Sequence, residues 1–418
     1  MSSSFTDLLE HALLPRPPDN LGVAVSGGGD SMALLHLLDP FCRNHGIQLH
    51  AVTVDHQLRP EAAAEARFVA RRCKDLGVPH DTLVWQGWDG QGNLQKAARD
   101  ARYREMTAWA RSRGVSAVAL GHTREDQAET VLMRLGRRAG VDGLSGMRHR
   151  VLRDGICWLR PLLRAHRADL RTYLVGKGVE WIDDPSNDDL NFDRIKARQI
   201  LDTLAPLGIG VDGLADVADQ MAQARKALEW QAFLVAQELA TTKSGAVIYD
   251  ERVLRSQPDE IRRRLFVRAI NWISGATYAP RRGAVAGLMQ GIAKGQASTA
   301  DGCHIRRIAE KIWIFRELNA VAGLQSPIQV LWDGRWRITP PADQRDVTDT
   351  YVRALGQDGI ENCPDWRGAG TPHVVLLSTP SIWRGDKMIA APLAGLANNW
   401  HADIEGGEES FFAGLLPY

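Results

Sequence analysis

The chain has little of what marks secreted, membrane and zinc-binding proteins. Its 418 residues include only five cysteines, and none forms a Cys-x-x-Cys pair of the kind that holds zinc, an iron–sulfur cluster or a redox disulfide. No stretch approaches the roughly 20 apolar residues of a membrane span, and the first residues lack a basic segment followed by an apolar core. We therefore expect a globular, cytoplasmic protein without membrane contact, whose cysteines are structural thiols.

The chain also lacks an excess of either charge, since 51 basic and 50 acidic residues leave a formal net charge of +1. A protein that coats nucleic acid without sequence preference would be more basic. The charge is unevenly spread, because ten arginines and three aspartates lie between Arg134 and Arg171. Such a segment is either a solvated surface or a binding site for a polyanion, and a nearby nucleotide site would favour the second interpretation.

The most informative segment is a glycine-rich loop, Ser26-Gly27-Gly28-Gly29-Asp30-Ser31, between an apolar strand and a helical run. Consecutive glycines let backbone N–H groups approach an anion, and the helix N-terminus adds about half a positive charge. The loop lacks the Gly-Lys-Ser/Thr ending of a Walker A motif. Because Asp30 would repel phosphate unless a divalent cation lies between them, the loop predicts a Mg-nucleotide site with Asp30 as the metal ligand.

Apolar runs alternate with helical patterns along the N-terminal half of the chain. The expected strands are 21–25, 49–54, 81–84 and 115–120, and the expected helices are 31–38, 61–76 and 93–113. Such alternation predicts an α/β fold with a doubly wound parallel sheet. Ligands bind at the carboxyl ends of strands in these sheets, which is where the glycine-rich loop, Asp55-His56 and Gly121-His122 fall.

We expect three domains. Residues 1–211 form the nucleotide-binding catalytic domain and end in a linker at 201–212, residues 212–320 form a helical or α+β domain, and residues 321–418 form a β-rich domain. A long amphipathic helix is expected near 212–240. In the last domain, we expect a hairpin around Gly334 with its two strands at 328–332 and 336–339.

Acidic residues lie together on the helix that follows the strand 115–120. The spacing of His122, Asp126 and Glu129 places them on one face of that helix. An isolated cluster of this kind is more often a surface feature. Here it falls at the same sheet edge as the glycine-rich loop, which favours an active site.

Several blocks taken in order are similar to one family. They are Ser26-Gly27-Gly28-Gly29-Asp30-Ser31, Val54-Asp55-His56-Gln57-Leu58-Arg59, Asn93 to Tyr103, Gly121 to Thr130, Asp142 to Met147, Arg160-Pro161-Leu162-Leu163, and Asp184-Pro185-Ser186-Asn187 through Arg198. Over about residues 20–205 the chain resembles the tRNA(Ile)-lysidine synthetases, which are PP-loop ATP pyrophosphatases. It departs from the family pattern at Glu125, where aspartate is usual, and at Arg137-Arg138, where glycine is favoured.

The resemblance implies a two-step reaction on the wobble cytidine of a minor isoleucine tRNA with a CAU anticodon. The cytosine 2-oxygen attacks the α-phosphate of ATP and releases pyrophosphate, and free L-lysine then displaces AMP through its ε-amine to give lysidine. Pairing changes from G to A, so the tRNA reads AUA instead of AUG.

The resemblance also implies roles for particular residues. The expected catalytic residues are Asp30, Asp126, Glu129 and Arg102, where Asp126 and Glu129 hold the lysine amines and Arg102 lies near the lysine carboxylate or the nucleotide. ATP and Mg²⁺ are expected at Ser26, Gly27, Gly28, Gly29, Asp30, Ser31, Asp55, His56 and His122, although a structural role for His122 is nearly as plausible. The expected tRNA contacts are Arg137, Arg138, Arg194, Lys196 and Arg198.

Two other functions remain open at this point. A PP-loop tRNA thiolase would attack the activated base with sulfur, but no cysteine lies in the motif blocks. A non-catalytic RNA-binding protein could keep a relic nucleotide fold, but the charged residues that catalysis needs are present. The oligomeric state is left open, with a homodimer as one option.

Overall fold

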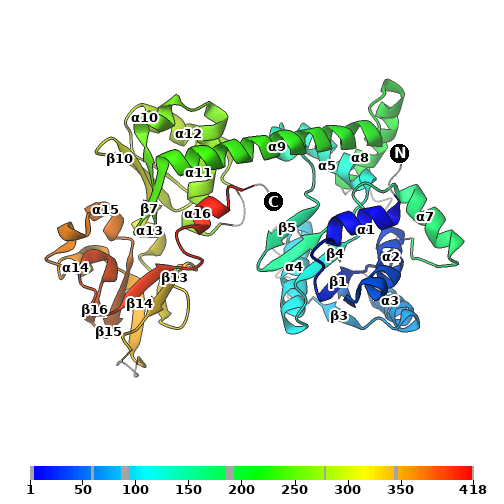
Figure 1. Ribbon diagram of the computed structural model, residues 1–418, viewed down its shortest axis with the longest axis horizontal. Helices are drawn as coiled ribbons and strands as arrows, with labels where there is room; N and C mark the ends of the chain where they lie inside the picture. The colour runs from blue at the N-terminus through cyan, green and yellow to red at the C-terminus, as the bar shows by residue number, and fades with distance from the viewer. Residues whose placement is uncertain are drawn as a thin grey trace. The chain divides into compact units, whose positions relative to one another are not determined.

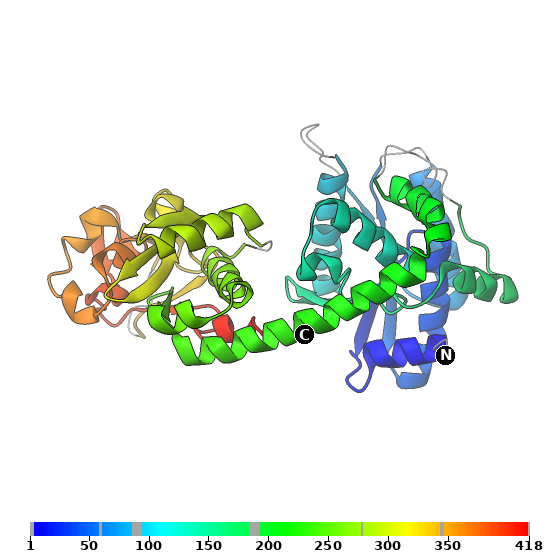
Figure 2. The same ribbon diagram turned by 90° about the horizontal axis from the view of Figure 1, so that it is seen from above.

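The computed structural model describes residues 4–57, 61–85, 94–183, 193–276, 279–342 and 347–416. The chain divides into two compact units, Met1–Arg225 and Lys226–Pro417. Helix α9 (Val211–Leu239) runs without interruption from the first unit into the second (Figure 2). The division into 1–211, 212–320 and 321–418 stays a prediction. Within the described ranges, no helix has both the length and the apolar character needed to cross a membrane.

The first unit contains a six-stranded sheet in the order β3-β2-β1-β4-β6-β5 (Figure 1). The strands are β1 (Asn20–Ala24), β2 (Gln48–Asp55), β3 (His80–Val84), β4 (Ala117–Leu120), β5 (Arg150–Arg153) and β6 (Ile156–Leu159). All neighbours pair in parallel except β5, which lies antiparallel at the edge. The predicted fold class is confirmed, and the β5–β6 hairpin is an addition that the strand pattern did not predict.

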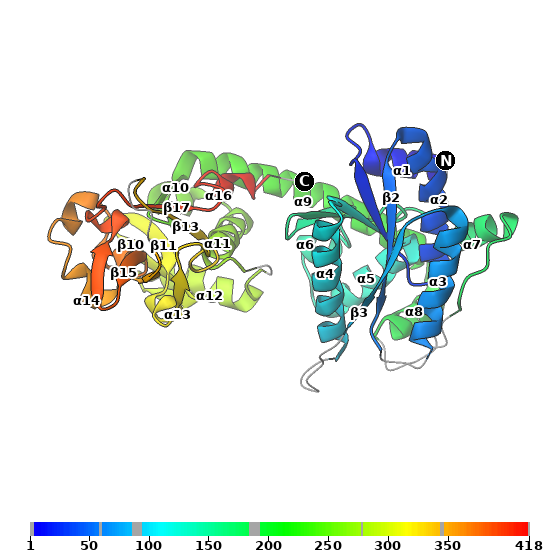
Figure 3. The ribbon, with the colours of Figure 1, turned by 90° about the horizontal axis from the view of Figure 1, so that it is seen from below.

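Helices cover both faces of this sheet. On one face, α1 (Phe5–Leu13), α2 (Gly29–His45), α3 (Ala62–Leu76) and α7 (Arg167–Gly176) share an apolar core with β1, β2 and β4. On the other, α4 (Leu94–Ser112) packs against the sheet (Figure 3). The connection that leaves β1 through α2 and the connection that enters β4 through α4 therefore lie on opposite faces, and the crevice at the carboxyl ends of β1 and β4 is where such sheets bind ligands.

A third group of helices lies beside this crevice. It consists of α5 (Arg124–Gly136), α6 (Val141–Leu144), α8 (Asp193–Leu204) and the first turns of α9. Leu201 of α8 and Leu214 of α9 are buried against α5. The expected linker at 201–212 is thus wrong at both ends, because α8 continues to Leu204 and α9 begins at Val211; only the short turn with η2 (Ala205–Leu207) connects them.

The second unit contains one five-stranded sheet and two smaller ones. The five-stranded sheet has β7 (Ala240–Lys243), β8 (Ala246–Asp250), β9 (Ser298–Ala300), β10 (Cys303–Ile308) and β11 (Lys311–Arg316), with α10 (Glu251–Ser256), α11 (Asp259–Ser274) and α12 (Arg282–Ala293). The long helix expected near 212–240 corresponds to α9, which begins at Val211 and ends at Leu239.

The last part of the chain contains two small sheets. Their elements are α13 (Leu318–Val321), β12 (Gln325–Pro327), β13 (Trp336–Thr339), β14 (Thr350–Ala354), α14 (Gly356–Ile360), η3 (Trp366–Ala369), α15 (His373–Leu376), β15 (Pro380–Arg384), β16 (Lys387–Ala390), η4 (Pro392–Ala394), β17 (His401–Ile404) and α16 (Ser410–Ala413). The predicted 328–332/336–339 hairpin is wrong, because β13 pairs with β17 and only an isolated bridge joins Trp332 to Trp336.

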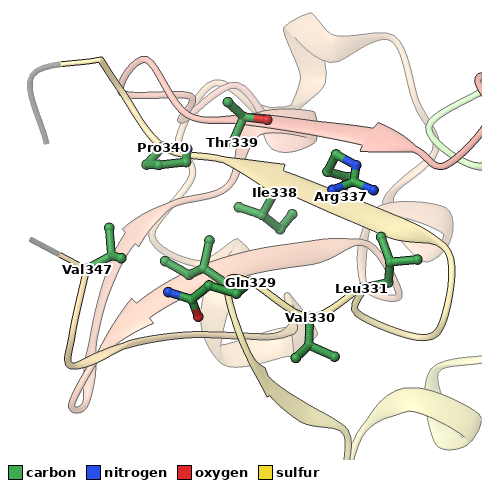
Figure 4. A pocket seen from close by; sticks show the side chains of 9 residues that line it. Gln329, Val330, Leu331, Arg337, Ile338, Thr339, Pro340 and Val347 are labelled. Atoms are coloured by element: carbon green, nitrogen blue, oxygen red, sulfur yellow. The ribbon is translucent and has the colours of Figure 1, made fainter. Parts of the chain in front are cut away.

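A pocket of about 250 Å³ lies in this last part, between the turn at 328–331 and β13 (Figure 4). Its lining is mostly apolar, and its one charged side chain, Arg337, pairs with Glu405. None of the lining residues is an acid, histidine or cysteine. The pocket therefore lacks the carboxylates that the predicted chemistry needs.

Candidate active site

The glycine-rich loop forms a tight turn between β1 and α2. Gly27 has φ +91°, a value that L side chains rarely adopt, and its carbonyl oxygen accepts from the Ile182 N–H at 2.9 Å. The Ser31 hydroxyl donates to the Gly28 carbonyl at 2.9 Å and accepts from the Ser26 N–H at 3.1 Å. The N-cap of α2 is Gly28, which has no side chain to cap the first turn. The Ser31 and Met32 N–H groups bond to the Gly28 carbonyl, so the amides before Ser31 are the ones that can meet an anion, as expected for a phosphate site.

Asp30, in the first turn of α2, pairs with a residue that the sequence analysis did not single out. The Arg167 Nε donates to Asp30 Oδ2 at 2.9 Å. Burial raises the pKa of Asp30 despite this guanidinium, and the nearby Asp126 and Glu125 carboxylates add to the increase. A carboxylate suits Mg²⁺. Within the described ranges there is no group of three or more His, Cys, Asp or Glu residues that could hold a metal, and Asp30 as a metal ligand stays a prediction.

The loop after β4 touches the glycine-rich loop directly. A Cβ built on Gly121 would lie 3.0 Å from the Asp30 carbonyl oxygen and 3.0 Å from the Ser31 Cα. Both are backbone atoms, so they cannot move aside as a flexible side chain would. Gly121 therefore sets how closely the two loops approach.

We expect Gly121→Ala to shift the glycine-rich loop, to weaken nucleotide binding and to destabilise the protein by about 1–3 kcal/mol, the usual cost of overpacking. Thermal melting with and without MgATP measures both effects. Gly136→Ala is the matched control, since a Cβ there meets nothing within 4 Å. Equal melting and nucleotide affinity in the two variants would contradict this close contact.

The residues predicted to share one face of helix α5 are arranged differently in the structure. The helix begins at Arg124 after the N-cap Thr123, so His122 lies in the preceding extended segment and not on the helix. Asp126 Oδ2 accepts from the Thr123 N–H at 2.9 Å, which completes a capping box. Burial lowers the pKa of His122 to about 3, and its Nδ1 is buried without a protein partner among the described residues. His122 is thus a neutral group at the edge of the site.

Asp126 is buried between two arginines. Its Oδ1 lies 3.6 Å from Arg167 Nη2 and 3.7 Å from Arg194 Nη1. Burial opposes ionisation, but His122 and these arginines outweigh it and lower the pKa of Asp126. Because His122 is neutral at pH 7, the two arginines are the groups that keep Asp126 charged.

Glu129 has an accepting oxygen without a partner. Its side chain is only 1 % exposed, and Oε1 accepts from Arg198 at 3.1 Å. Oε2 is buried and has no hydrogen-bond partner in the part of the chain that the structure describes. An unpaired buried carboxylate oxygen is costly unless a ligand supplies the donor. Burial, together with the charge of Asp126, raises the pKa of Glu129.

Asp55, His56 and Arg102 form a second polar group at the carboxyl end of β2. The Asp55 carboxylate accepts from the Gln57 N–H at 2.8 Å, and Arg102 donates to His56 Nε2 at 3.1 Å. Burial and the neighbouring Arg102 lower the pKa of His56 to about 4, so the ring is neutral and can accept this bond. The positive charges of Arg102 and Arg194 repel each other, so this group lies near the arginine that also faces Asp126.

The five residues predicted to bind tRNA occupy two kinds of position. Arg137, Arg138 and Lys196 are exposed, whereas Arg194 and Arg198 turn inward to the acids of α5. Arg138 has φ +57°, a conformation that favours glycine and explains the family's preference for glycine in this loop. Whether these residues contact RNA stays a prediction. The Asp184-Pro185-Ser186-Asn187 block and Leu58-Arg59 lie outside the described residues.

Sequence reasoning missed two contributors to the site. Ile182 supports the loop through Gly27, and Arg167 joins Asp30 to Asp126. Arg167 lies in the arginine-rich segment for which we expected either a solvated surface or a polyanion-binding site, but its side chain is only 20 % exposed. The same segment includes Arg160, which is buried. The apolar Pro161-Leu162-Leu163 run next to these arginines was the available signal that part of the segment turns inward.

The fold and the loop define a class, the PP-loop domains with an ATP-binding parallel sheet. A family profile described as the PP-loop domain matches residues 1–204. Among solved structures, the U34-tRNA thiolase NcsA from Methanococcus maripaludis is similar with a TM-score of 0.45 and 13% identity, over 52% of this chain and 77% of that chain.

The curated relatives are more specific. The tRNA(Ile)-lysidine synthase of Ruegeria pomeroyi is 49% identical over 99% of this chain and 98% of its own length. That of Bradyrhizobium diazoefficiens is 41% identical over 78% of this chain and 91% of its own length. The chain belongs to the tRNA(Ile)-lysidine synthase family.

Proposed function

We propose that this chain uses ATP to join lysine to C2 of the wobble cytidine of an isoleucine tRNA with a CAU anticodon. The observation that carries the proposal is the Glu129 carboxylate, which is buried on the helix after β4 and, in the described part of the chain, has one oxygen without a hydrogen-bond partner. That oxygen is placed to take a proton or an ammonium hydrogen bond from a ligand. Family membership supplies the identity of the substrates.

The first step requires stabilisation of negative charge on ATP. The cytosine 2-oxygen attacks the α-phosphate, and pyrophosphate leaves. The amides at the start of α2 and the Ser26 hydroxyl would bind the phosphates, while the Ser31 hydroxyl, which donates to the Gly28 carbonyl, would hold the loop in shape. Asp30 would hold Mg²⁺ together with the phosphates, where the metal would offset the charge that grows on the leaving group.

The second step requires a base. The lysine ε-amine has an ordinary pKa near 10.4, and deprotonation at pH 7 costs about 4.6 kcal/mol at 1.36 kcal/mol per pKa unit. Asp126, with a lowered pKa, is suited to hold an ammonium, while Glu129, with a raised pKa, is suited to accept a proton. The amine then attacks C2 of the cytosine, and AMP leaves.

Substrate choice needs more than the wobble base, because a methionine tRNA also carries a CAU anticodon. Single-stranded anticodon loops present bases, whereas stems are read through shape and phosphates. The exposed Arg137, Arg138 and Lys196 lie on the same unit as the acids of α5 and supply positive charge for the loop backbone. We propose that the second unit reads the tRNA body. The oligomeric state of the protein stays open.

The direct test is incubation of the full-length protein with ATP, labelled L-lysine and purified isoleucine or methionine tRNA transcripts at fixed salt. We expect label to enter only the isoleucine tRNA, with one AMP and one pyrophosphate released for each lysine attached. Each misread tRNA position should cost about 1–3 kcal/mol, by analogy with mismatched sites in nucleic-acid recognition. Release of ADP, or equal labelling of both tRNAs, would contradict the proposal.

The thiolase alternative is not favoured. Cys42, Cys73, Cys303 and Cys363 are buried. Burial raises the pKa of the Cys42, Cys73 and Cys303 thiols to about 12, so these sulfurs are protonated and unreactive at neutral pH. Cys157 is in β6, and burial raises its pKa as well.

A further inference from the structure

Arg167 joins the two half-sites of the reaction. Its Nε donates to Asp30 at 2.9 Å, on the nucleotide side, and its Nη2 lies 3.6 Å from Asp126, on the lysine side. Both acids precede it by many residues in the chain, so only the fold brings them together. The mechanism described above uses both acids and does not use Arg167.

The contacts of Arg167 conflict with those that the substrates need. Mg²⁺ bound to Asp30 would repel the guanidinium, which donates to Oδ2 of the same carboxylate at 2.9 Å, and so would weaken the contact between Asp30 and Arg167. Asp126 can take the lysine ammonium more readily when Arg167 is gone, for the same reason. The phosphates of ATP are a new partner for the freed guanidinium, with which arginine pairs well.

We propose that Arg167 couples the two sites, so that binding of MgATP withdraws Arg167 from Asp126 and raises the affinity of that site for lysine. Arg167 is a positioning residue that acts through Asp30 and Asp126. The coupling would favour lysine binding once nucleotide is present. This inference rests on the proposed function, because it takes ATP and lysine as the ligands.

The fold holds Arg167 in place through Glu125. Both Glu125 carboxylate oxygens accept from the Arg167 backbone N–H, at 3.1 and 3.0 Å, and Oε1 also lies 3.4 Å from His166 Nδ1. These bonds tie the start of α7 to the first turn of α5. Glu125 is one of the positions where this chain departs from the family's usual aspartate, and its longer side chain supplies this bridge.

The test measures lysine binding by calorimetry on the full-length protein without tRNA, in the absence and presence of Mg²⁺ and the α,β-methylene analogue of ATP. We expect the analogue to tighten lysine binding about tenfold in the wild type, within the usual range of coupling between two sites. By reciprocity, lysine should tighten analogue binding by the same factor.

In Arg167→Gln, lysine should bind without nucleotide about as tightly as it binds the nucleotide-loaded wild type, and the analogue should change its affinity less than about twofold. Arg167→Lys keeps a charge but not the two-ended guanidinium, so we expect intermediate coupling.

Arg171→Gln is the matched control: it lies one turn further along α7, is 54 % exposed and pairs with Asp183. It should keep the wild-type coupling. Thermal melting checks that each variant is folded.

Variants of Glu125, whose carboxylate accepts from the Arg167 backbone N–H, test the coupling independently. Glu125→Ala removes both acceptors of the Arg167 N–H and should reduce the coupling, while Glu125→Gln retains an acceptor oxygen and should preserve most of it. A merely structural role would lower melting temperature without moving the coupling factor.

The outcomes separate this inference from the proposed function. Retention of the full coupling in a folded Arg167→Gln variant would overturn the role of Arg167 and leave the proposed function intact. The same conclusion would follow if lysine and the analogue both bind to the wild type without affecting each other. Absence of lysine binding under both conditions would instead overturn the lysine site itself, and this inference with it.

Discussion

Asp30→Asn should leave the protein folded and reduce tRNA adenylation by about a hundredfold or more, the loss typical of removing one group that stabilises transition-state charge. The asparagine has the same shape and can still accept the hydrogen bond that Arg167 donates. It cannot offset the charge of a divalent cation. The measurement is pyrophosphate release with ATP, Mg²⁺ and isoleucine tRNA in the absence of lysine.

Asp39→Asn provides the control, because Asp39 lies further along α2 and pairs with Arg43 at the helix surface. It should release pyrophosphate at the wild-type rate. Parental activity in a folded Asp30→Asn variant would remove Asp30 from the metal-linked role and would leave the helix amides as the main phosphate contacts.

Local patterns predicted the nucleotide half of the site. The loop Ser26 to Ser31, the strand before it and the helix after it are adjacent in sequence, so glycine content and apolar periodicity are enough to place them. The parallel order of β1, β2 and β4 then follows from the alternation of strands and helices, and it brings the loops after them to one edge.

Contacts between residues far apart in the chain could not be predicted in this way. Arg167 and Asp30 are separated by 137 residues, so the apolar run at 161–163 could indicate that part of the segment turns inward but could not identify Asp30 as the partner of Arg167. The partner of β13 is β17 rather than the segment just before it, so the hairpin prediction failed although the alternation of apolar residues was read correctly. The placement of His122 on the helix was wrong for a different reason: Thr123 is the N-cap, so the helix begins at Arg124, two residues after His122.

The burial of the acids could not be predicted either, although it decides their roles. Asp126 and Glu129 are three residues apart and look equivalent in sequence. The structure pairs Asp126 with two arginines and leaves one Glu129 oxygen unpaired, so burial and charge move their pKa values in opposite directions. Such a pair is suited to divide binding and proton transfer between its members.

Glu129→Gln should therefore separate the two steps. The amide keeps the shape and can still accept from Arg198, but it cannot accept a proton. We expect lysine transfer to fall by about 10²–10⁴-fold, the usual contribution of a general base, while adenylation stays measurable. The measurement is single-turnover transfer of lysine to tRNA that has been adenylated beforehand. Glu105→Gln, an exposed acid on α4 paired with Arg104, is the control.

The pH dependence provides a second readout of the same group. Because burial and the charge of Asp126 raise the pKa of Glu129, its carboxylate takes up a proton at a higher pH than an ordinary glutamate does as the solution is acidified, and the base is lost there. Wild-type transfer should fall on the acidic side through this titration as well as through the loss of free amine. In Glu129→Gln only the amine titrates, so the profile should follow lysine alone. An identical profile in both proteins would show that Glu129 holds the amine without taking its proton, and Asp126 would then be the remaining candidate for the base.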